Sequence, residues 1–438
     1  MKKKLLLIIS LISFGVNAQS WTEKATGFSS PNISLNSISI VDDNVIWASA
    51  FDITDFEHPD YTVKEFTKSI DSGETWTTGA INLGPNSEDM EISSITAVSD
   101  QIAWISVSPG ATNTGGIWQT TDGGVTWTKQ STASFSSADS WPNFVHFWDT
   151  NNGVAQGDPE NNEFEIYTTN DGGTTWTRVP AANTPDATVG SEYGYYNIYT
   201  VSGDNIWFGT DLGRIFKSTD KGLSWTAYNS GVSTDFGLDR FSFSDANKGI
   251  LMTHDDLKLY STIDGGETWN SITTPDFFKT DIAYIPGTST VIASSFADPV
   301  GSAYSIDNGL NWIPIDNLIH GQLVFLNNNV GFSAGKTIDA TIGGIYKFTS
   351  APLKTPSFTA EKQIAVYPNP TNGILHIDSK TGLKEASVFD LLGRKVYSSK
   401  FSASNSNTLD IRSLQSGSYI LKTTSNDGST ETTKILKK

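Results

Sequence analysis

One eight-residue phrase, which we call the box, recurs six times along this chain of 438 residues and constrains its fold more than any other feature. It reads Ser/Thr-x-Asp-x-Gly-x-Thr/Ser/Asn-Trp. The box aspartates are Asp71, Asp122, Asp171, Asp220, Asp264 and Asp307, at steps of 51, 49, 49, 44 and 43 residues. A period of about 40 to 50 residues in Gly-, Thr- and Trp-rich sequence indicates a radial β architecture.

Each period predicts a blade of four antiparallel strands, in which the box is the turn between the third and fourth strands. The second strand can be read seven times, and so can the third, whose last copy at 344–348 has no box after it. Trp21-Thr-Glu-Lys24 has the pattern of the strands that follow complete boxes, such as Trp127-Thr-Lys129. We therefore predict an all-β fold, a seven-bladed β-propeller over residues 19–351 that is closed by its N-terminal strand.

The boxes resemble the Asp-box (BNR) repeats of sialidases, sortilin-type receptors, xyloglucan-degrading hydrolases and photosystem II assembly-factor propellers. The resemblance implies the fold, but these families differ in function, so it does not select one. We expect the six box aspartates to be structural, because each can accept backbone N–H groups within its turn. The box Gly tolerates a positive φ, and the Trp packs between blades. A catalytic or calcium-binding role would need one special site rather than six equivalent ones.

Both ends of the chain carry segments outside the predicted propeller. Residues 1–18 are predicted to be a signal peptide, with a basic start at Lys2–Lys4, an apolar run from Leu5 to Val16 and a small-residue cleavage site at Ala18. No later stretch approaches about 20 apolar residues, so we expect no transmembrane helix. Residues 352–360 contain two prolines and are predicted to be a linker.

The tail, residues 361–438, carries its own set of motifs. They are Val366-Tyr-Pro-Asn-Pro370, Val388-Phe-Asp-Leu-Leu-Gly393-Arg394, Leu409-Asp-Ile-Arg-Ser-Leu414 and the terminal Lys434–Lys438. These motifs resemble the type A C-terminal sorting domain of Bacteroidetes type IX secretion cargo, and alternating apolar residues support a small β-sandwich. The resemblance implies export through the periplasm and the type IX translocon, removal of the tail by the sortase, and a final place outside the cell or on its surface.

The predicted propeller is strongly acidic. Residues 19–351 hold 40 Asp and Glu against 14 Lys and Arg, a net charge of −26, whereas residues 361–438 have a net charge of +4. Binding to a phosphate backbone needs clustered Lys and Arg, so nucleic acid is not an expected partner. The chain has no cysteine, which excludes disulfides, and its five histidines are scattered, so we predict no metal site and no cofactor. Calcium binding at an acidic loop is left open, although no calcium-loop motif supports it.

Loop lengths distinguish the two ends of the predicted propeller. The turns between strands 1 and 2 and between strands 3 and 4 share one end, where all the boxes lie. The loops between strands 2 and 3 and between blades share the other end, which we call the loop-rich face. Its long loops are expected at 51–63, 79–92, 108–116, 130–143, 157–164 and 179–195. Binding residues usually lie on variable loops held by a rigid scaffold, so this face is the candidate functional surface.

Trp141 is the one tryptophan of 13 that has no repeat position, and it lies in the loop that enters blade 3. An aromatic platform near carboxylates and a few cations suits a glycan or a peptide. The candidate ligand-binding residues are Trp141, Asp158, Glu160, Tyr193, Tyr195, Asp211, Arg214 and Arg240. The alternative is that Trp141 and the tyrosines only pack long loops onto the rim of the propeller.

Two hydrolytic activities can be weighed from the residues. Sialidases bind the substrate carboxylate with three arginines, one in an Arg-Ile-Pro motif, whereas the predicted propeller lacks that motif and has only Arg178, Arg214 and Arg240. Arg178 falls on an outer strand, so a sialidase site is not expected. A glycoside hydrolase needs two carboxylates about 5–10 Å apart, one with a raised pKa. Asp158 and Glu160, which we place in the loop between strands 2 and 3 of blade 3, would be that pair.

We therefore expect a secreted or cell-surface propeller that binds a glycan or a protein without catalysis. A polysaccharide hydrolase that uses carboxylates of the loop-rich face is the first alternative. An envelope assembly or scaffold factor is the second, by analogy with the photosystem factors.

Overall fold

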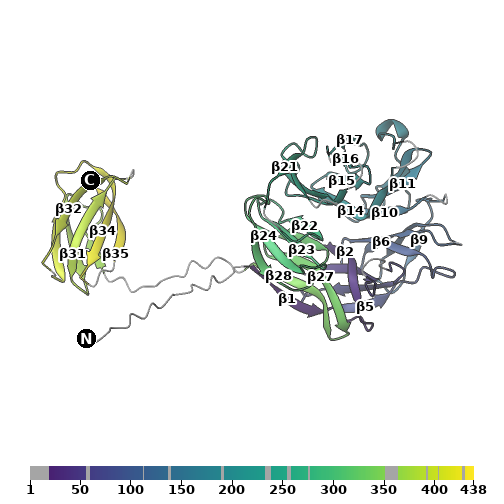
Figure 1. Cartoon of the computed structure of the whole chain (residues 1–438), viewed down its shortest axis with the longest axis horizontal. Helices are drawn as coiled ribbons and strands as arrows, with labels where there is room; N and C mark the ends of the chain where they lie inside the picture. The colour runs from purple at the N-terminus through teal and green to yellow at the C-terminus, as the bar shows by residue number, and fades with distance from the viewer. Residues whose placement is uncertain are drawn as a thin grey trace, which may run out of the picture. The chain divides into compact units, whose positions relative to one another are not determined.

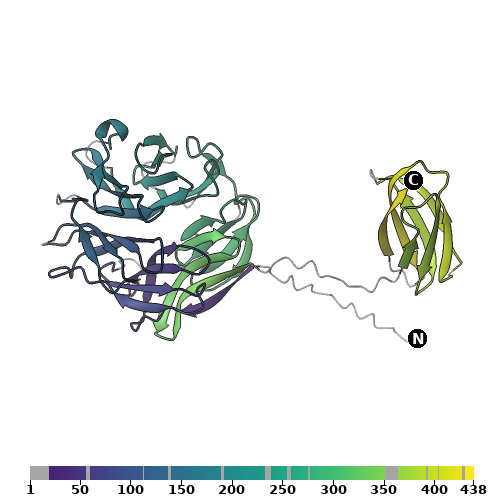
Figure 2. The ribbon, with the colours of Figure 1, turned by 180° about the vertical axis from the view of Figure 1, so that it is seen from behind.

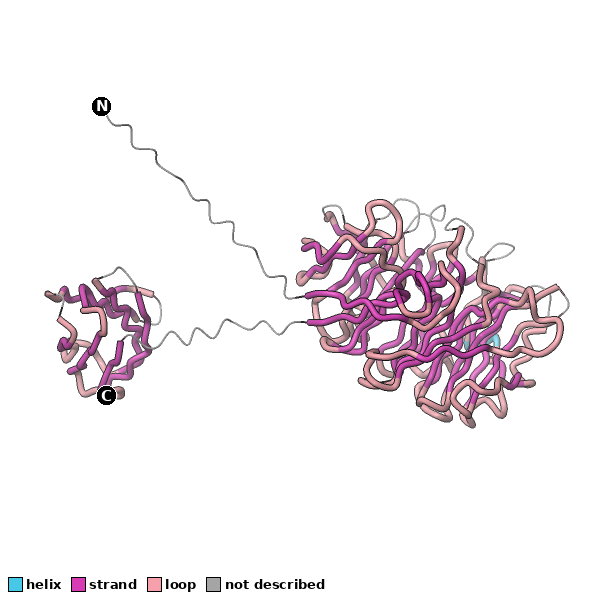
Figure 3. The backbone as a smooth tube through the Cα atoms, turned by 90° about the horizontal axis from the view of Figure 1, so that it is seen from below, coloured by secondary structure: helices cyan, strands magenta, loops and turns pink. Residues whose placement is uncertain are grey.

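The computed structural model describes residues 19–55, 60–111, 113–136, 140–188, 192–231, 238–253, 258–274, 277–350, 364–390, 393–402, 404–426 and 430–438. The predicted signal peptide and linker lie outside these residues. The chain divides into two compact units, Met1–Ala351 and Pro352–Lys438. The regular structure is strand apart from one 3-10 turn in the described residues, η1 (Ala181–Asn183), and no helix there has the length and apolar character to cross a bilayer (Figure 3).

Seven four-stranded antiparallel sheets, the blades, follow one another in chain order around a ring (Figure 1). Blade 1 is β2 (Ile33–Ile40), β3 (Ile46–Asp52), β4 (Glu65–Ser69) and β5 (Thr77–Ala80). Blade 2 is β6 (Glu91–Ala97), β7 (Ala103–Ser108), β8 (Gly116–Thr120) and β9 (Thr128–Gln130). Blade 3 is β10 (Pro142–Phe147), β11 (Gly153–Glu160), β12 (Glu163–Thr169) and β13 (Thr177–Arg178).

The second half of the ring repeats this plan. Blade 4 is β14 (Gly194–Ser202), β15 (Asn205–Thr210), β16 (Arg214–Ser218) and β17 (Thr226–Asn229). Blade 5 is β18 (Leu238–Phe243), β19 (Gly249–Thr253), β20 (Leu259–Thr262) and β21 (Asn270–Ile272). Blade 6 is β22 (Asp281–Tyr284), β23 (Val291–Ser295), β24 (Gly301–Ser305) and β25 (Ile313–Asp316). Blade 7 is β26 (Leu323–Asn327), β27 (Val330–Asp339), β28 (Ile342–Ser350) and the first strand of the chain, β1 (Gln19–Ala25).

The N-terminal strand closes the ring as predicted. β1 pairs antiparallel with β28, and Trp21 lies opposite Phe348. Figure 2 shows from behind how the purple β1 runs beside the green strands of blade 7. The Trp21 ring centre lies 5.0 Å from that of Phe348, and its Nε1 donates a hydrogen bond of 3.0 Å to Ser302 Oγ in blade 6. The predicted seven-bladed propeller is therefore confirmed.

Serine side chains join the innermost strands of neighbouring blades. Ser37 Oγ of blade 1 accepts the backbone N–H of Ile95 in blade 2 at 3.1 Å. Two later serines, Ser94 and Ser242, accept N–H groups of the next blade at 3.0 and 2.9 Å. These bonds satisfy backbone donors at the central channel, which the sheet ladder of each blade leaves unpaired.

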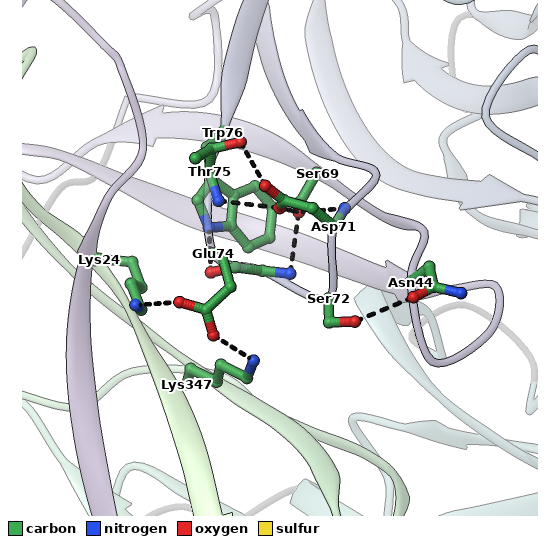
Figure 4. Close-up of polar contacts among 10 residues, drawn as sticks. Lys24, Asn44, Ser69, Asp71, Ser72, Glu74, Thr75, Trp76 and Lys347 are labelled. Carbon is green, nitrogen blue, oxygen red and sulfur yellow. Dashed lines mark hydrogen bonds and ion pairs between the residues drawn. The ribbon is translucent and has the colours of Figure 1, made fainter.

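The six boxes share one hydrogen-bond pattern, which Figure 4 shows for the first. Asp71 Oδ1 accepts the N–H of Thr75 at 2.8 Å, and Oδ2 accepts its hydroxyl at 2.6 Å. Ser69 Oγ accepts the N–H of Gly73 at 2.9 Å and donates to Asp71 Oδ1 at 2.8 Å. The bonds from Thr75 lower the pKa of Asp71 to about 2. The same backbone bond measures 2.9–3.0 Å in the other five boxes.

The first box also contacts the closing strands (Figure 4). Lys24 on β1 donates to Glu74 Oε2 at 2.5 Å, and Lys347 on β28 donates to Glu74 Oε1 at 2.7 Å. The indole of Trp76 packs edge-on against Phe332 of blade 7, with ring centres 5.8 Å apart. Blade 1 is thus tied to both strands that complete blade 7.

The second unit is a small β-sandwich with its own core. One sheet contains β29 (Ile364–Tyr367), β30 (Ile374–Ser379) and β33 (Ser406–Asp410). The other contains β32 (Lys395–Lys400), β31 (Leu383–Phe389), β34 (Gly417–Ser425) and β35 (Thr430–Lys437). The core side chains include Leu375, Ile377, Val388, Leu409, Leu421 and Ile435. This is the sandwich that alternating apolar residues predict for the tail.

Candidate functional site

The predicted long loop at 157–164 is wrong. β11 runs on to Glu160, and only Asn161 and Asn162 connect it to β12. Both residues have positive φ, 53° and 67°, which is the backbone that a tight two-residue hairpin favours. Asp158 therefore belongs to a strand and not to a solvated loop.

A β-bulge sets the direction of the Asp158 side chain. The pairing of β11 with β12 shifts between Gly157 and Pro159, so Asp158 is the extra residue. Asp158 Oδ1 accepts a hydrogen bond of 2.7 Å from Asn143 Nδ2 and one of 2.8 Å from the N–H of Gly194. Because Asn143 lies in blade 3 and Gly194 in blade 4, the carboxylate bridges the two innermost strands. Its Oδ2 receives no hydrogen bond from the described residues.

Burial raises the pKa of Asp158 to about 6, although the bonds from Asn143 and Gly194 act against this shift. The negative charge of Asp211 raises it further. Burial also raises the pKa of Asp211, to which the charge of buried Glu192 contributes. Two carboxylates that disfavour each other's ionisation can accept hydrogen bonds from hydroxyl groups, and one of them can carry a proton near neutral pH.

Two residues with exposed aromatic side chains, Trp141 and Tyr193, are joined through their backbones to Asp158 and Asp211. Trp141 O accepts the N–H of Asp158 at 3.0 Å, and Tyr193 O accepts the N–H of Asp211 at 3.1 Å. Asp211 Oδ1 in turn accepts the N–H of Tyr193 at 2.8 Å. Trp141 is 37% exposed and Tyr193 is 47% exposed, whereas Tyr195 packs edge-on against Tyr193 with ring centres 5.6 Å apart. We call Trp141, Asp158, Tyr193, Tyr195 and Asp211 the blade 3–4 patch.

Glu160 lies apart from this patch. It forms an ion pair with Arg178 on the outer strand β13, with Nη1 and Oε2 3.4 Å apart. Arg178 also lies 3.7 Å from Glu165, whose side chain is almost fully buried. The bulge at Asp158 breaks the alternation of β11, so the two carboxylates that we considered as a hydrolytic pair serve different surroundings.

Arg214 is occupied in an internal ion pair. Its Nη1 lies 2.6 Å from Oε2 of Glu192, whose side chain has no exposed surface. Glu192 Oε1 accepts the hydroxyl of Thr210 at 2.7 Å, and the Arg214 guanidinium lies over the Phe216 ring at 4.7 Å. A buried carboxylate needs this partner, so we assign Arg214 to holding the loop before β14 in place.

Arg240 lines the central channel, a cavity of about 1030 Å³ between the innermost strands. Its Nε lies 3.5 Å from Oδ1 of Asp281 on the neighbouring blade, and its side chain is 36% exposed. Two residues that sequence analysis did not single out, Tyr61 and Tyr196, line the same cavity, and Glu91 accepts the hydroxyl of Tyr196 at 2.8 Å.

The innermost strand of blade 4 departs most from the shared plan. In blades 1, 2 and 3 one extra residue bulges near the start of the strand, namely Asn36, Ser93 and Asn143. In blade 4 the four residues 195–198 stand opposite a single residue of β15. A spacing argument cannot detect this difference, because the boxes on either side keep their period.

The described residues contain no group of three or more His, Asp or Glu that could hold a metal ion. His146 lines the channel and is half-buried, and desolvation lowers its pKa to about 3. The imidazole is therefore neutral at physiological pH.

Comparison with known proteins gives different relatives for the two units. Residues 365–438 match the family of secretion system C-terminal sorting domains, so the chain is type IX secretion cargo that reaches the cell surface or the medium. No curated protein matches the chain.

Among solved structures, the chain resembles YCF48 bound to a D1 peptide, with a TM-score of 0.53 and 16% identity over 76% of this chain and 97% of that one. It also resembles YCF48 from Cyanidioschyzon merolae, with a TM-score of 0.51 and 18% identity over 76% of this chain and 100% of that one. Identities this low support the β-propeller fold alone.

Proposed function

We propose that the propeller, residues 19–351, is the binding part of an exported protein and recognises a glycan at the blade 3–4 patch without cleaving it. The observation that carries the proposal is that two residues with exposed aromatic rings, Trp141 and Tyr193, are joined by backbone hydrogen bonds to Asp158 and Asp211, whose carboxylates accept backbone N–H groups. Aromatic faces bury the apolar faces of sugar rings, and oriented carboxylates accept their hydroxyl groups.

Export determines where the propeller would meet its ligand. Residues 1–18 act as the signal peptide, and residues 361–438 engage the type IX translocon and its sortase. The propeller then meets extracellular polysaccharide, either released or attached to the surface. A protein ligand is the main rival, since YCF48, with the same fold, was solved with a bound peptide. The exposed rings of Trp141 and Tyr193, together with the carboxylate acceptors of Asp158 and Asp211, favour a polyhydroxyl ligand over a peptide.

The test is a glycan array and a set of soluble polysaccharides, followed by titration calorimetry with the full chain from residue 19 on. Trp141→Ala and Tyr193→Ala each remove one ring, and we expect each to weaken binding by about tenfold or more. Tyr367→Ala in the tail is the matched control, because Tyr367 is also 47% exposed. Binding that survives both patch substitutions would place the site elsewhere, and binding to no glycan would refute the proposal.

A second function, polysaccharide hydrolysis, is favoured by one observation, the raised pKa of Asp158 next to Asp211. In that case Asp158 would be the proton donor, and Asp211, rather than Glu160, its partner carboxylate. Reducing ends released from a polysaccharide by the wild type and lost in Asp158→Asn would establish catalysis. A binding protein releases none in either form.

A further inference from the structure

The entrance of the central channel on the loop-rich face is built from aromatic rings of two different blades. Tyr61, between β3 and β4 of blade 1, stacks on Phe51 with ring centres 5.3 Å apart. Tyr196 of blade 4 packs edge-on against Tyr61 at 5.7 Å. All three side chains line the cavity of about 1030 Å³, which lies near the upper end of the size of ligand pockets.

The wide bulge of blade 4 positions Tyr196 there. Asn197, the next residue, has a φ of 56° and reaches across the channel to blade 1. Its Nδ2 donates to Asn36 O at 3.1 Å, and its Oδ1 accepts the hydroxyl of Ser37 at 3.1 Å. A bulge held at both ends by hydrogen bonds fixes its side chains before any ligand arrives.

Charges of both signs surround these rings. Tyr196 donates its hydroxyl to Glu91 Oε2 at 2.8 Å. Burial raises the pKa of Tyr61, and the charges of Arg240 and Glu91 both act on its hydroxyl. Arg240 faces Asp281, whose carboxylate also accepts the N–H groups of Ile282 and Leu323 at 2.8 and 2.6 Å. The entrance therefore offers donors, acceptors and aromatic faces within one cavity.

This mixture of charges restricts the class of ligand that the entrance can bind. An anionic ligand meets Glu91 and Asp281, and a cationic ligand meets Arg240. The propeller as a whole has a net charge of −26, which repels a polyanion further. An uncharged ligand that is rich in hydroxyl groups can pair with both signs at once and still cover the rings.

We propose that the channel entrance, formed by Tyr61, Glu91, Tyr196 and Arg240, is a second subsite that takes one uncharged sugar residue, so the recognised glycan is a neutral polysaccharide. This inference rests on the glycan-binding function proposed above. The two sites are electrostatically coupled, because the negative charge of Asp158 in the blade 3–4 patch acts on the hydroxyl of Tyr196 at the entrance.

Titration calorimetry with the full chain from residue 19 on tests this subsite. The probes are neutral hexasaccharides of glucose, xylose and mannose, and hexagalacturonate as a charged chain of the same length. We expect binding of at least one neutral hexasaccharide, and binding of hexagalacturonate at least about tenfold weaker. Tyr61→Phe removes only a hydroxyl group and should weaken the neutral hexasaccharide about 3- to 10-fold. Arg240→Lys keeps the charge but loses the planar donor pair, and should weaken it by about tenfold.

Tyr228→Phe on the outer strand β17 makes the same chemical change away from the channel and should leave binding unchanged. If Tyr61→Phe and Arg240→Lys bind as the wild type while Tyr193→Ala does not, the second subsite is refuted and the proposed function stands. Equal or tighter binding of hexagalacturonate refutes the neutral class. If the wild type binds none of these saccharides and no glycan on the array, both proposals fail together.

Discussion

The closing strand allows a direct measurement of what holds the ring together. The Trp21 ring lies 5.0 Å from Phe348 in blade 7 and 5.1 Å from His320, and its Nε1 donates to Ser302 of blade 6. Trp21→Ala removes these contacts and keeps the backbone pairing of β1 with β28. The substitution therefore separates side-chain packing from strand pairing at the closure.

The expected loss follows from the burial of the ring. Replacing a fully buried Trp by Ala costs about 3–5 kcal/mol, and since Trp21 is only half-buried we take about 3 kcal/mol. Ser302 still donates to Asp316 Oδ1 at 3.0 Å, so loss of the indole N–H adds at most about 1 kcal/mol. With an unfolding entropy of about 2.1 cal/mol/K per residue over about 330 residues, each kcal/mol lowers Tm by about 1.4 °C. We expect Tm to fall by about 4–6 °C.

Differential scanning calorimetry of the chain from residue 19 on measures this shift. Val125→Ala is the control, because it truncates a hydrophobic side chain at an 80% exposed position and should change Tm by no more than about 1 °C. Limited proteolysis should also release β1 earlier in Trp21→Ala. If Trp21→Ala melts within about 1 °C of the wild type, the indole contacts do not hold the ring closed and the argument from packing is wrong.

Three further predictions concern glycine geometry and pH. Gly124→Ala should lower the free energy of unfolding, measured in urea, by at least about 3 kcal/mol, because a Cβ there would lie 2.2 Å from the Phe66 ring and the residue has a φ of 94°. Gly203→Ala, with open space around it, should lower it by only about 1 kcal/mol. Equal losses would contradict the packing argument. Asp158→Asn should raise Tm at pH 8 but not at pH 4. The reason is that a carboxyl whose folded pKa is raised to about 6 loses its stabilising contribution as pH rises from about 4 to 6. A difference in Tm that does not depend on pH would mean that Asp158 is not held in its protonated form. Asp264 has a pKa lowered to about 2, so its contribution to stability is present above about pH 4 and is lost as pH falls to 2. Asp264→Asn should therefore make Tm depend less steeply on pH in that range. An unchanged slope would refute this prediction.

The fold could be predicted because its determinants are local and repeated. Each box places a Ser or Thr, an Asp and a Gly at fixed offsets, and the hydrogen bonds of the turn connect residues two to four positions apart. The closing strand could be predicted for the same reason, since Trp21 begins the same short pattern as the strands after complete boxes. No contact between distant residues had to be known.

The site depends on contacts that spacing does not encode. The repeat pattern predicts a loop at 157–164 around Asp158, yet β11 continues through a bulge that accommodates Pro159, which has no N–H to donate, and Asn161 and Asn162 make a tight turn. Arg214, at the start of β16, pairs with Glu192, which is 22 residues away in sequence, so spacing does not reveal this contact. The surroundings of each carboxylate depend here on neighbours that are distant in the sequence.

Departures from the repeat are therefore the best guide to function in this propeller. The blades must share one backbone conformation to pack around a ring. A substitution at one position of a blade therefore changes the side chain but leaves its direction the same as at the equivalent positions of the other blades. A bulge changes that direction. Two of the irregularities, the bulge at Asp158 in β11 and the wide bulge at 195–198 in β14, lie in adjacent blades, and the N–H of Gly194, next to the second, donates to Asp158 at the first. Two independent irregularities that meet in one hydrogen bond indicate a site that the repeat alone would not build.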